Sequence, residues 1–170
     1  MELIPSLFTQ DEKDLLLDLQ ENLNSVFHNR FYSLFNIYKT DIPSEYWNTT
    51  IIDKLKDKVP GYNLDWMYFL KYVEGSFANK HYDVGIKKTI ITLLDDNKLV
   101  GGETLFFTKQ TTTFKRAPKF PTVPDFSQEI EIPSVASLQV GDAVMYDNKQ
   151  KHAVCKVHSG ERTVLVSWFK

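Results

Sequence analysis

The sequence is notable first for what it lacks: a run of 18 or more apolar residues, a long basic stretch, and more than one cysteine in 170 residues. Without a long apolar run, no membrane span is expected. The net charge of −2 gives no electrostatic basis for binding nucleic acid or an anionic membrane. Cys155 alone cannot form an internal disulfide, and the first residues do not resemble a signal peptide, so we predict a cytoplasmic location.

Two further absences concern the class of fold. The sequence has no Gly-rich phosphate-binding loop and no alternation of strands and helices that would indicate a parallel sheet. A nucleotide-binding Rossmann or P-loop protein is therefore not expected. The composition, with 42% hydrophobic and 14% aromatic residues, is typical of a folded globular protein. A chain of this length is expected to form one domain, covering residues 1–170, with a sizeable core.

The first third of the chain has a pattern that predicts helices. Thr9 and Glu12 have the spacing of a capping box. Apolar residues then recur three and four positions apart, which predicts one face of a helix: Leu15, Leu16, Leu19, Leu23, Val26 and Phe27. A second helix is expected from about residue 43 to 58, ended by Pro60-Gly61. We therefore expect a helical part over about residues 1–60, which contains His28.

From Trp66 onward the pattern changes to short β-rich runs separated by turn residues. Eight runs can be recognised: WMYFLKYV, KTIITLLDD, GETLFFTK, TTTFKRA, QEIEI, DAVMYD, HAVCKV and RTVLVSWF. Eight short strands suit a sandwich or an open barrel. The segment from Pro118 to Phe126, with three prolines, is expected to be a loop over one mouth of it. The sequence therefore predicts a mainly β fold, with a β core over about residues 66–170 and helices flanking it.

Three residues are candidates for a metal site. His81 and Asp83 lie two positions apart, so at the end of a strand both can point to the same side. Such a pair is weak evidence alone, since about one chain in two of this composition would contain one by chance. His152, which opens a β-run after a turn, is the best third candidate by position. Two histidines and a carboxylate are the set that suits non-haem Fe(II).

Arg162 opens the last β-run, where strand alternation puts it on one face with Val164, Val166 and Trp168. A guanidinium on an apolar inward face needs an anionic partner, and its planar fork suits a carboxylate. Two arrangements remain open. In a tight hairpin around Ser159-Gly160, Arg162 would lie about 17 Å from His152. If the chain instead crosses to a facing sheet about 10 Å away, a small dicarboxylate could bridge the metal and Arg162.

Four blocks of residues 66–170, in order, resemble the prolyl-4-hydroxylase type of Fe(II)/2-oxoglutarate-dependent dioxygenases. They are YVEGSFANKHYD (72–83), GGETLF (101–106), GDAV (141–144) and HAVCKVHSGERTVLVSW (152–168). The resemblance implies a double-stranded β-helix, a cupin-like jelly roll with the N-terminal helices packed outside. It also implies Fe(II) and O₂ as cofactors, 2-oxoglutarate as cosubstrate, and ascorbate as a candidate reductant.

The same resemblance assigns roles to individual residues. His81, Asp83 and His152 would ligate the iron, and Arg162 would pair with the distal carboxylate of 2-oxoglutarate. Tyr72 would lie near the cosubstrate. Trp168 would line the site. The implied reaction is hydroxylation of an aliphatic C–H bond, with a prolyl residue in a protein or peptide as the nearest suggestion for the substrate.

Several alternatives stay open at the level of sequence. Where many relatives carry a tyrosine in the strand before the GGET block, this chain has Leu93, so the cosubstrate pocket is expected to use fewer hydroxyl donors. The substrate could instead be a free amino acid or a small metabolite. A non-catalytic jelly-roll binding module is a third reading, and Zn-dependent hydrolysis a fourth, although no general base is evident for it.

Overall fold

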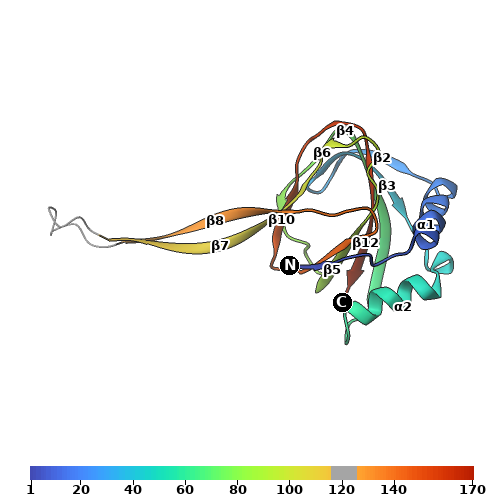
Figure 1. Ribbon diagram of the computed structural model, residues 1–170, viewed down its shortest axis with the longest axis horizontal. Helices are drawn as coiled ribbons and strands as arrows, with labels where there is room; N and C mark the ends of the chain where they lie inside the picture. The colour runs from blue at the N-terminus through green and yellow to red at the C-terminus, as the bar shows by residue number, and fades with distance from the viewer. Residues whose placement is uncertain (116–125) are drawn as a thin grey trace.

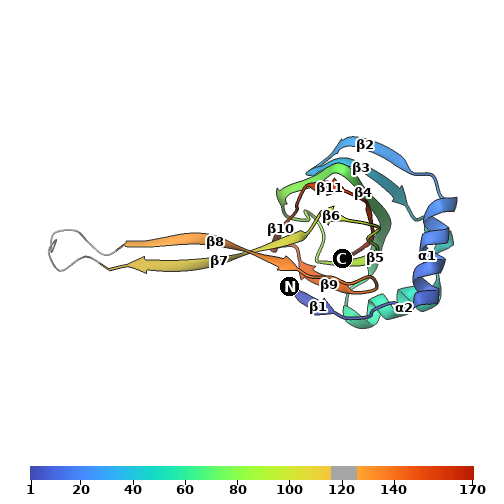
Figure 2. The same cartoon turned by 45° about the horizontal axis from the view of Figure 1, so that its top comes forward.

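A computed structural model describes residues 1–115 and 126–170, and its main feature is a large antiparallel sheet curled into a nearly closed barrel (Figures 1 and 2). In this sheet the strands follow the order β1-β9-β5-β12-β4-β10-β7-β8, and β3 and β2 add to β4 in turn. The strands are β1 (Glu2–Ile4), β2 (Val26–Phe31), β3 (Leu34–Asp41), β4 (Leu64–His81), β5 (Lys88–Asp95), β7 (Thr104–Phe114), β8 (Phe126–Ala136), β9 (Ala143–Asp147), β10 (Lys151–Val154) and β12 (Arg162–Phe169). A separate pair joins β6 (Val100–Gly101) to β11 (Val157–Ser159).

The strand β12 shows how the sheet separates two apolar cores. Its alternate residues Val164 and Val166 face the barrel interior, where they pack with inward residues of neighbouring strands. Leu165 and Phe169, on the opposite side of the same strand, pack in a second core that lies against the helices. Because both faces are covered, β12 is an almost continuous apolar run, as expected for a strand buried on both sides.

The helices α1 (Gln10–Asn22) and α2 (Thr49–Lys58) lie together on the outside of the barrel (Figure 2). The capping box predicted at the start of α1 is present, with Thr9 and Glu12 each bonding the other's backbone N–H. Before α2, a short 3-10 turn, η1 (Ser44–Tyr46), follows Pro43, so the second helix begins later than predicted. The prediction that helices pack outside a mainly β barrel is confirmed.

The helical prediction for residues 26–41 is wrong. The helix α1 ends at Asn22, and the apolar residues Val26 and Phe27 belong to β2, which forms a hairpin with β3. His28 therefore lies in a strand. The spacing of Val26 and Phe27 continued the periodicity of α1 by coincidence, and neither side chain is buried. The pairing of β3 with β4 decides the outcome here.

The long strand β4 ties the two halves of the barrel together. Its first part pairs with β12, from Leu64 to Tyr72, and its end pairs with β10, up to His81. Between them Gly75 has φ +85°, a conformation that favours glycine, and the strand changes direction there. Since β11 pairs with β6 and not with β12, the chain does not form a tight hairpin around Ser159-Gly160. The tight hairpin is therefore not formed, and β12 and β10 belong to one sheet, in which both pair with β4.

The strand boundaries differ from the sequence prediction in the β half as well. The runs GETLFFTK and TTTFKRA meet in one strand, β7, which ends at Phe114, and HAVCKV is divided between β10 and β11. Residues 116 and 117 of the second run lie outside the described residues. The predicted loop from Pro118 to Phe126 lies outside the described residues, except that Phe126 begins β8.

No helix in the part of the chain that the structure describes has both the length and the apolar character needed to traverse a bilayer.

Candidate functional site

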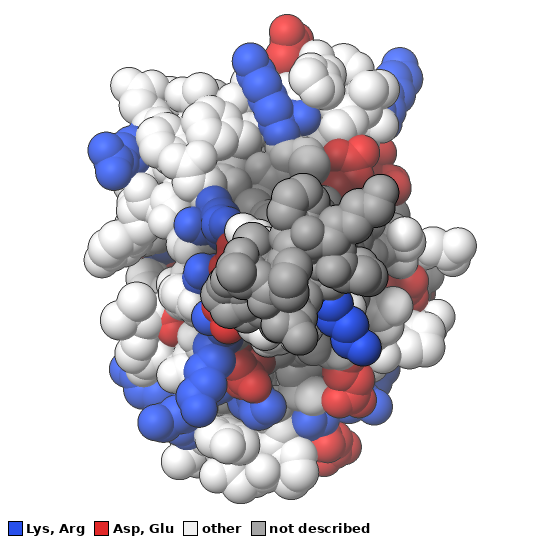
Figure 3. All heavy atoms as spheres, turned by 90° about the vertical axis from the view of Figure 1, so that its left-hand side faces the viewer, with Lys and Arg blue, Asp and Glu red and all other residues white. Residues whose placement is uncertain are grey.

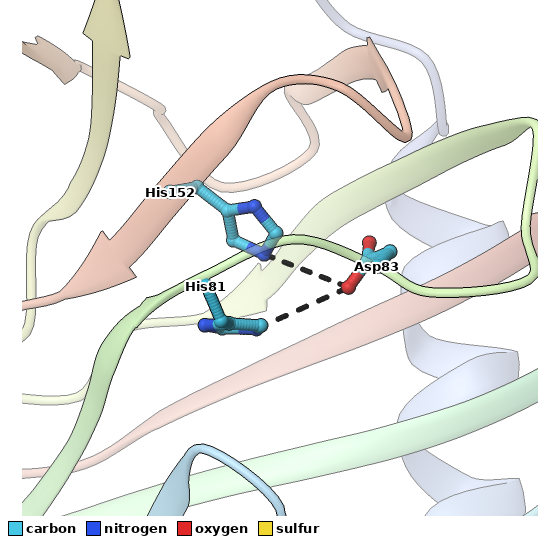
Figure 4. A group of neighbouring side chains, drawn as sticks. All are labelled: His81, Asp83 and His152. Carbon is cyan, nitrogen blue, oxygen red and sulfur yellow. Dashed lines mark ion pairs between the residues drawn. The ribbon is translucent and has the colours of Figure 1, made fainter.

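The side chains of His81, Asp83 and His152 converge on one point (Figure 4). His81 is the last residue of β4 and Asp83 follows it in the connection to β5, while His152 lies in β10 directly opposite His81. Residues directly opposite each other on antiparallel strands are close neighbours, and the two imidazole centroids are 4.2 Å apart. The Asp83 Oδ1 atom lies 3.9 Å from His81 Nε2 and 3.7 Å from His152 Nε2.

Backbone carbonyl groups fix which nitrogen of each ring faces the centre. His81 Nδ1 is 2.6 Å from the carbonyl oxygen of Asn79, and His152 Nδ1 is 3.2 Å from that of Gln150. Each Nδ1 then carries the proton and donates it, which leaves the Nε2 lone pair pointing toward Asp83. Burial, and next the neighbouring His81, lower the pKa of His152, with Asp83 opposing them, so the neutral ring is favoured.

The carboxylate of Asp83 is oriented by two hydroxyl groups that sequence reasoning did not single out. Its Oδ2 atom accepts hydrogen bonds from Thr89 Oγ1 at 2.7 Å and Tyr146 Oη at 3.0 Å. Burial raises the pKa of Tyr146 well above its usual value, with Asp83 adding to the effect, so the phenol stays protonated and donates. With Oδ2 bonded in this way, Oδ1 is left free to face the two imidazoles. Tyr146 Oη also lies 3.3 Å from His152 Nε2, a longer contact than its bond to Asp83.

The Oδ1 atom of Asp83 and the Nε2 atoms of the two histidines suit a divalent metal ion. They all lie within 4.8 Å of one another. Adjacent corners of an octahedron with bonds of about 2.1 Å are about 3 Å apart, so small side-chain movements would close the set around an ion. The three side chains leave further coordination positions open, and two histidines with one carboxylate are the ligand set of non-haem Fe(II) sites.

Arg162 points into the barrel from the start of β12. It is 4% exposed, and its guanidinium donates to the Gly102 carbonyl oxygen and, at 3.2 Å, to Thr104 Oγ1. Its Nε atom is buried with no hydrogen-bond partner, and no carboxylate of the described residues forms an ion pair with it. Burial lowers the pKa of Arg162, and Tyr72, Glu103 and Asp96 oppose this from beyond ion-pair distance. A buried cation with no direct ion pair is costly, so this arrangement suits an anionic ligand.

A cavity of about 160 Å³ adjoins the Arg162 side chain and is also lined by Leu93, Gly102 and Thr104. Gly102 has φ +73°, and a Cβ there would meet Val157 Cγ2 at 3.0 Å. The preceding Gly101 is more constrained still, because a Cβ would lie 2.2 Å from a backbone oxygen. These glycines are required by the backbone, which explains the GGET block in physical terms.

The relation between Arg162 and the three converging residues follows from strand register. Arg162 bonds Thr104, Thr104 pairs with Val154, and Val154 is two residues from His152 on β10. Two strand residues span roughly 7 Å. A small dicarboxylate can cover a separation of that order, with one end at the metal ligands and the other at the guanidinium.

The two aromatic candidates lie at opposite ends of the barrel interior. Tyr72 pairs with Arg162 in register, and the guanidinium carbon is 5.2 Å from the centre of its ring. Burial raises the pKa of Tyr72 to about 12, so its hydroxyl is a donor at neutral pH. Trp168 pairs with Thr89, the residue that bonds Asp83, and packs edge-on against Trp66 and Tyr68. Its buried Nε1 has no partner.

Tyr146 and Thr89 could be anticipated only weakly from the sequence. Tyr146 follows the GDAV block at the spacing that puts it on the same face as Val144, and both are buried in the barrel interior. Nothing in the sequence indicates that their hydroxyls meet Asp83, because that contact joins three separate segments. The other two histidines, His28 and His158, are not in the cluster formed by His81, Asp83 and His152.

Taken together, the barrel and the converging residues define a jelly-roll protein with a two-histidine, one-carboxylate centre beside an arginine-lined pocket. A family model described as the 2OG-Fe(II) oxygenase superfamily matches residues 67–170, which is more than half of the chain, and the protein belongs to this family. By class it is a 2-oxoglutarate-dependent dioxygenase, with Fe(II) and 2-oxoglutarate as its cofactors.

Solved structures share the fold at low sequence identity. A 2OG-Fe(II) oxygenase family oxidoreductase from Burkholderia pseudomallei is 16% identical, with a TM-score of 0.71 over 99% of this chain and 84% of that one. A Pseudomonas putida prolyl-4-hydroxylase is 15% identical, with a TM-score of 0.63 over 99% of this chain and 91% of that one. The viral collagen prolyl hydroxylase of Paramecium Bursaria Chlorella virus-1 is 18% identical, with a TM-score of 0.61 over 99% of this chain and 94% of that one. No curated protein sequence matches the chain.

Proposed function

We propose that the protein hydroxylates an aliphatic C–H bond, and that His81, Asp83 and His152 hold its Fe(II). The support is the donor set itself. Two Nε2 atoms are oriented by carbonyl groups, and one carboxylate oxygen is left free by the bonds from Thr89 and Tyr146. These outer hydrogen bonds are the kind that hold metal ligands in place and tune them.

Arg162 is the residue that we assign to 2-oxoglutarate, and it is the single observation that carries the proposal. Its buried guanidinium forms no ion pair with a described carboxylate and adjoins a cavity, and strand register puts it roughly 7 Å from His152. The distal carboxylate of 2-oxoglutarate would supply the missing anion. Tyr72, held under the guanidinium, is a hydroxyl donor to the same ligand. Leu93 lines the cavity with carbon only, so the carboxylate depends more heavily on Arg162.

When bound, Fe(II) with 2-oxoglutarate and O₂ supplies the oxidant for the substrate C–H bond, with succinate and CO₂ as by-products. The contribution of the protein is to orient these groups and to keep water away from them. Phe106 is 1% exposed and lies against Tyr146 and His152, which closes one wall of the centre with apolar surface. Ascorbate remains a proposed reductant.

For the substrate we propose a prolyl residue in a protein or peptide. Two of the solved structures with this fold are prolyl hydroxylases, which supports the assignment by analogy only. Others are the epimerase SnoN from nogalamycin biosynthesis and HygX from Streptomyces hygroscopicus with hygromycin B bound. A free amino acid or small metabolite is therefore the second candidate, and a cytoplasmic location is part of the same proposal.

The test is formation of succinate from 2-oxoglutarate with Fe(II) and O₂. We expect turnover with the unaltered protein and background levels with His81→Ala, because two remaining ligands hold a divalent ion loosely. His28→Ala, a histidine of β2 outside the site, is the matched control and should retain turnover. Undiminished turnover in His81→Ala would contradict the assignment. Absence of turnover in the unaltered protein, with or without peptides, would favour a binding module.

A further inference from the structure

The strands β7 and β8 form a two-stranded arm that projects from the barrel (Figures 1 and 2). At its base, β7 also pairs with β10, but the last residue in that register is Phe107. Beyond it, β7 and β8 continue to pair with each other as far as Phe114 and Phe126. The seven residue-to-residue steps from Phe107 to Phe114 span about 24 Å.

The two faces of the arm differ in charge. One face carries the ion pair between Lys109 and Glu129, at 2.6 Å, and Glu131, which is bonded by Lys80 and Lys151 at 2.5 Å each. By strand alternation and register, the other face has no charged side chain. Its residues are Thr108, Gln110, Thr112, Phe114, Phe126, Gln128, Ile130 and Ile132.

The uncharged face is continuous with the inner wall of the barrel. Phe106 precedes Thr108 on the same face, and its ring centroid lies 6.0 Å from that of His152. The neighbouring Lys151 points the opposite way, to Glu131 on the charged face. Two independent contacts therefore place the uncharged face on the side of the metal ligands. A molecule bound along this face would have one end next to the metal ligands.

Four of the eight side chains on this face are apolar, and they are uncovered. Ile130, Ile132, Phe114 and Phe126 are 37%, 41%, 43% and 57% exposed, and the two Phe rings stack on each other with centroids 4.8 Å apart. A two-stranded ribbon with one apolar face gains stability when that face is covered. The side of the molecule from which the arm projects carries acidic and basic residues interspersed, so charge of one sign does not select the partner (Figure 3).

We propose that the uncharged face of the arm binds an extended, uncharged segment of a polypeptide substrate, whose target residue enters the barrel beside His152. The inference rests on the proposed function and narrows its substrate class. A free amino acid would have no use for a surface that continues about 24 Å beyond the barrel. Thr and Gln side chains can bond a peptide backbone, and the Ile and Phe side chains can bury its apolar groups.

The test compares two double variants that add the same charge to opposite faces of the arm. Ile130→Lys with Ile132→Lys places two ammonium groups on the uncharged face. Thr111→Lys with Thr113→Lys places two on the charged face and is the control. The probes are N-acetylated, C-amidated Ala-Pro peptides of four and of twenty residues, titrated by calorimetry against protein loaded with Mn(II) and 2-oxoglutarate.

For the unaltered protein we expect the long peptide to bind at least about tenfold more tightly than the short one, since burying one additional Ile side chain is worth about that factor. The variant of the uncharged face should lose this gain in affinity, while the control variant keeps it. All three proteins should keep the same peptide-independent conversion of 2-oxoglutarate to succinate.

Equal affinity for both lengths, no binding of the long peptide, or equal weakening in both double variants would overturn the proposal. So would a dimer of the unaltered protein in sedimentation that the Ile130→Lys, Ile132→Lys variant abolishes, because the face would then bind a second copy. Binding and succinate formation are measured separately. Absence of succinate from every protein counts against the proposed function alone, whereas loss of the length effect counts against the arm alone.

Discussion

The same strand behaves differently at its two ends. In β7, Phe106 is fully buried next to His152, whereas Phe114, at the other end of the strand and on the same face, is 43% exposed. The difference lies in what covers them: Phe106 has the barrel interior on one side, and Phe114 has only its stacking partner Phe126. Alternation of residues sets which way a side chain points, but the surrounding strands decide whether it builds a rigid site or an open surface.

The largest expected effect is a difference in the free energy of unfolding between substitutions at the two ends of β7. Phe106→Ala should lower the free energy of unfolding by about 3–5 kcal/mol, because it leaves a cavity in the barrel core. Phe114→Ala, the same substitution on the arm, should cost no more than about 1 kcal/mol, from its exposed stacking contact. Chemical denaturation of both variants measures the difference. Equal losses would show that the arm is covered in solution.

The next effect concerns the buried arginine. Arg162→Ala should raise the KM for 2-oxoglutarate by about 100-fold, since a charge-assisted, two-pronged pairing with the carboxylate is lost. Arg162→Lys keeps the positive charge but loses the planar two-pronged geometry, so its KM should lie between those of the unaltered protein and Arg162→Ala. Arg30→Ala, in the exposed β2–β3 hairpin, is the control. Steady-state succinate formation at varied 2-oxoglutarate gives these constants, and an unchanged KM in Arg162→Ala would remove this residue from the pocket.

A smaller effect is expected from the hydroxyl that holds Asp83. Tyr146→Phe removes one of two hydrogen bonds to Oδ2 and keeps the one from Thr89. Metal affinity should fall about tenfold, the low end of what lost outer hydrogen bonds cost. Anaerobic titration with Mn(II) measures this without relying on turnover. Tyr38→Phe, which removes a hydroxyl in the exposed β2–β3 hairpin, is the control and should leave the metal affinity near that of the unaltered protein.

Much of the site could be predicted because its chemistry is concentrated in short motifs. His81 and Asp83 are two residues apart, His152 opens a β-run, and the alternation of β12 put Arg162 on the inward face. The hydrogen-bond partner of Tyr146 could not be predicted, because its bond to Asp83 joins segments that are far apart in the sequence. That contact is a property of tertiary packing alone.

The fold class could be predicted, but two of its features could not. Residues 26–41 form a hairpin because β3 can pair with β4, a partner that lies 27 residues or more away in sequence for every pair in the register. The apolar spacing next to α1 gave no sign of it. The arm was divided into separate runs at Gln110, between GETLFFTK and TTTFKRA, where a polar residue interrupts the strand pattern. The segment is held extended by register with β8.

The most direct test of the central claim is a crystal structure of the protein grown without oxygen in the presence of Mn(II) and 2-oxoglutarate. The account predicts one ion bound by His81 Nε2, His152 Nε2 and the Asp83 carboxylate, with the far carboxylate of 2-oxoglutarate on the Arg162 guanidinium. A metal ion bound elsewhere, or Arg162 paired with an acidic side chain of the protein while 2-oxoglutarate lies apart from it, would contradict the account.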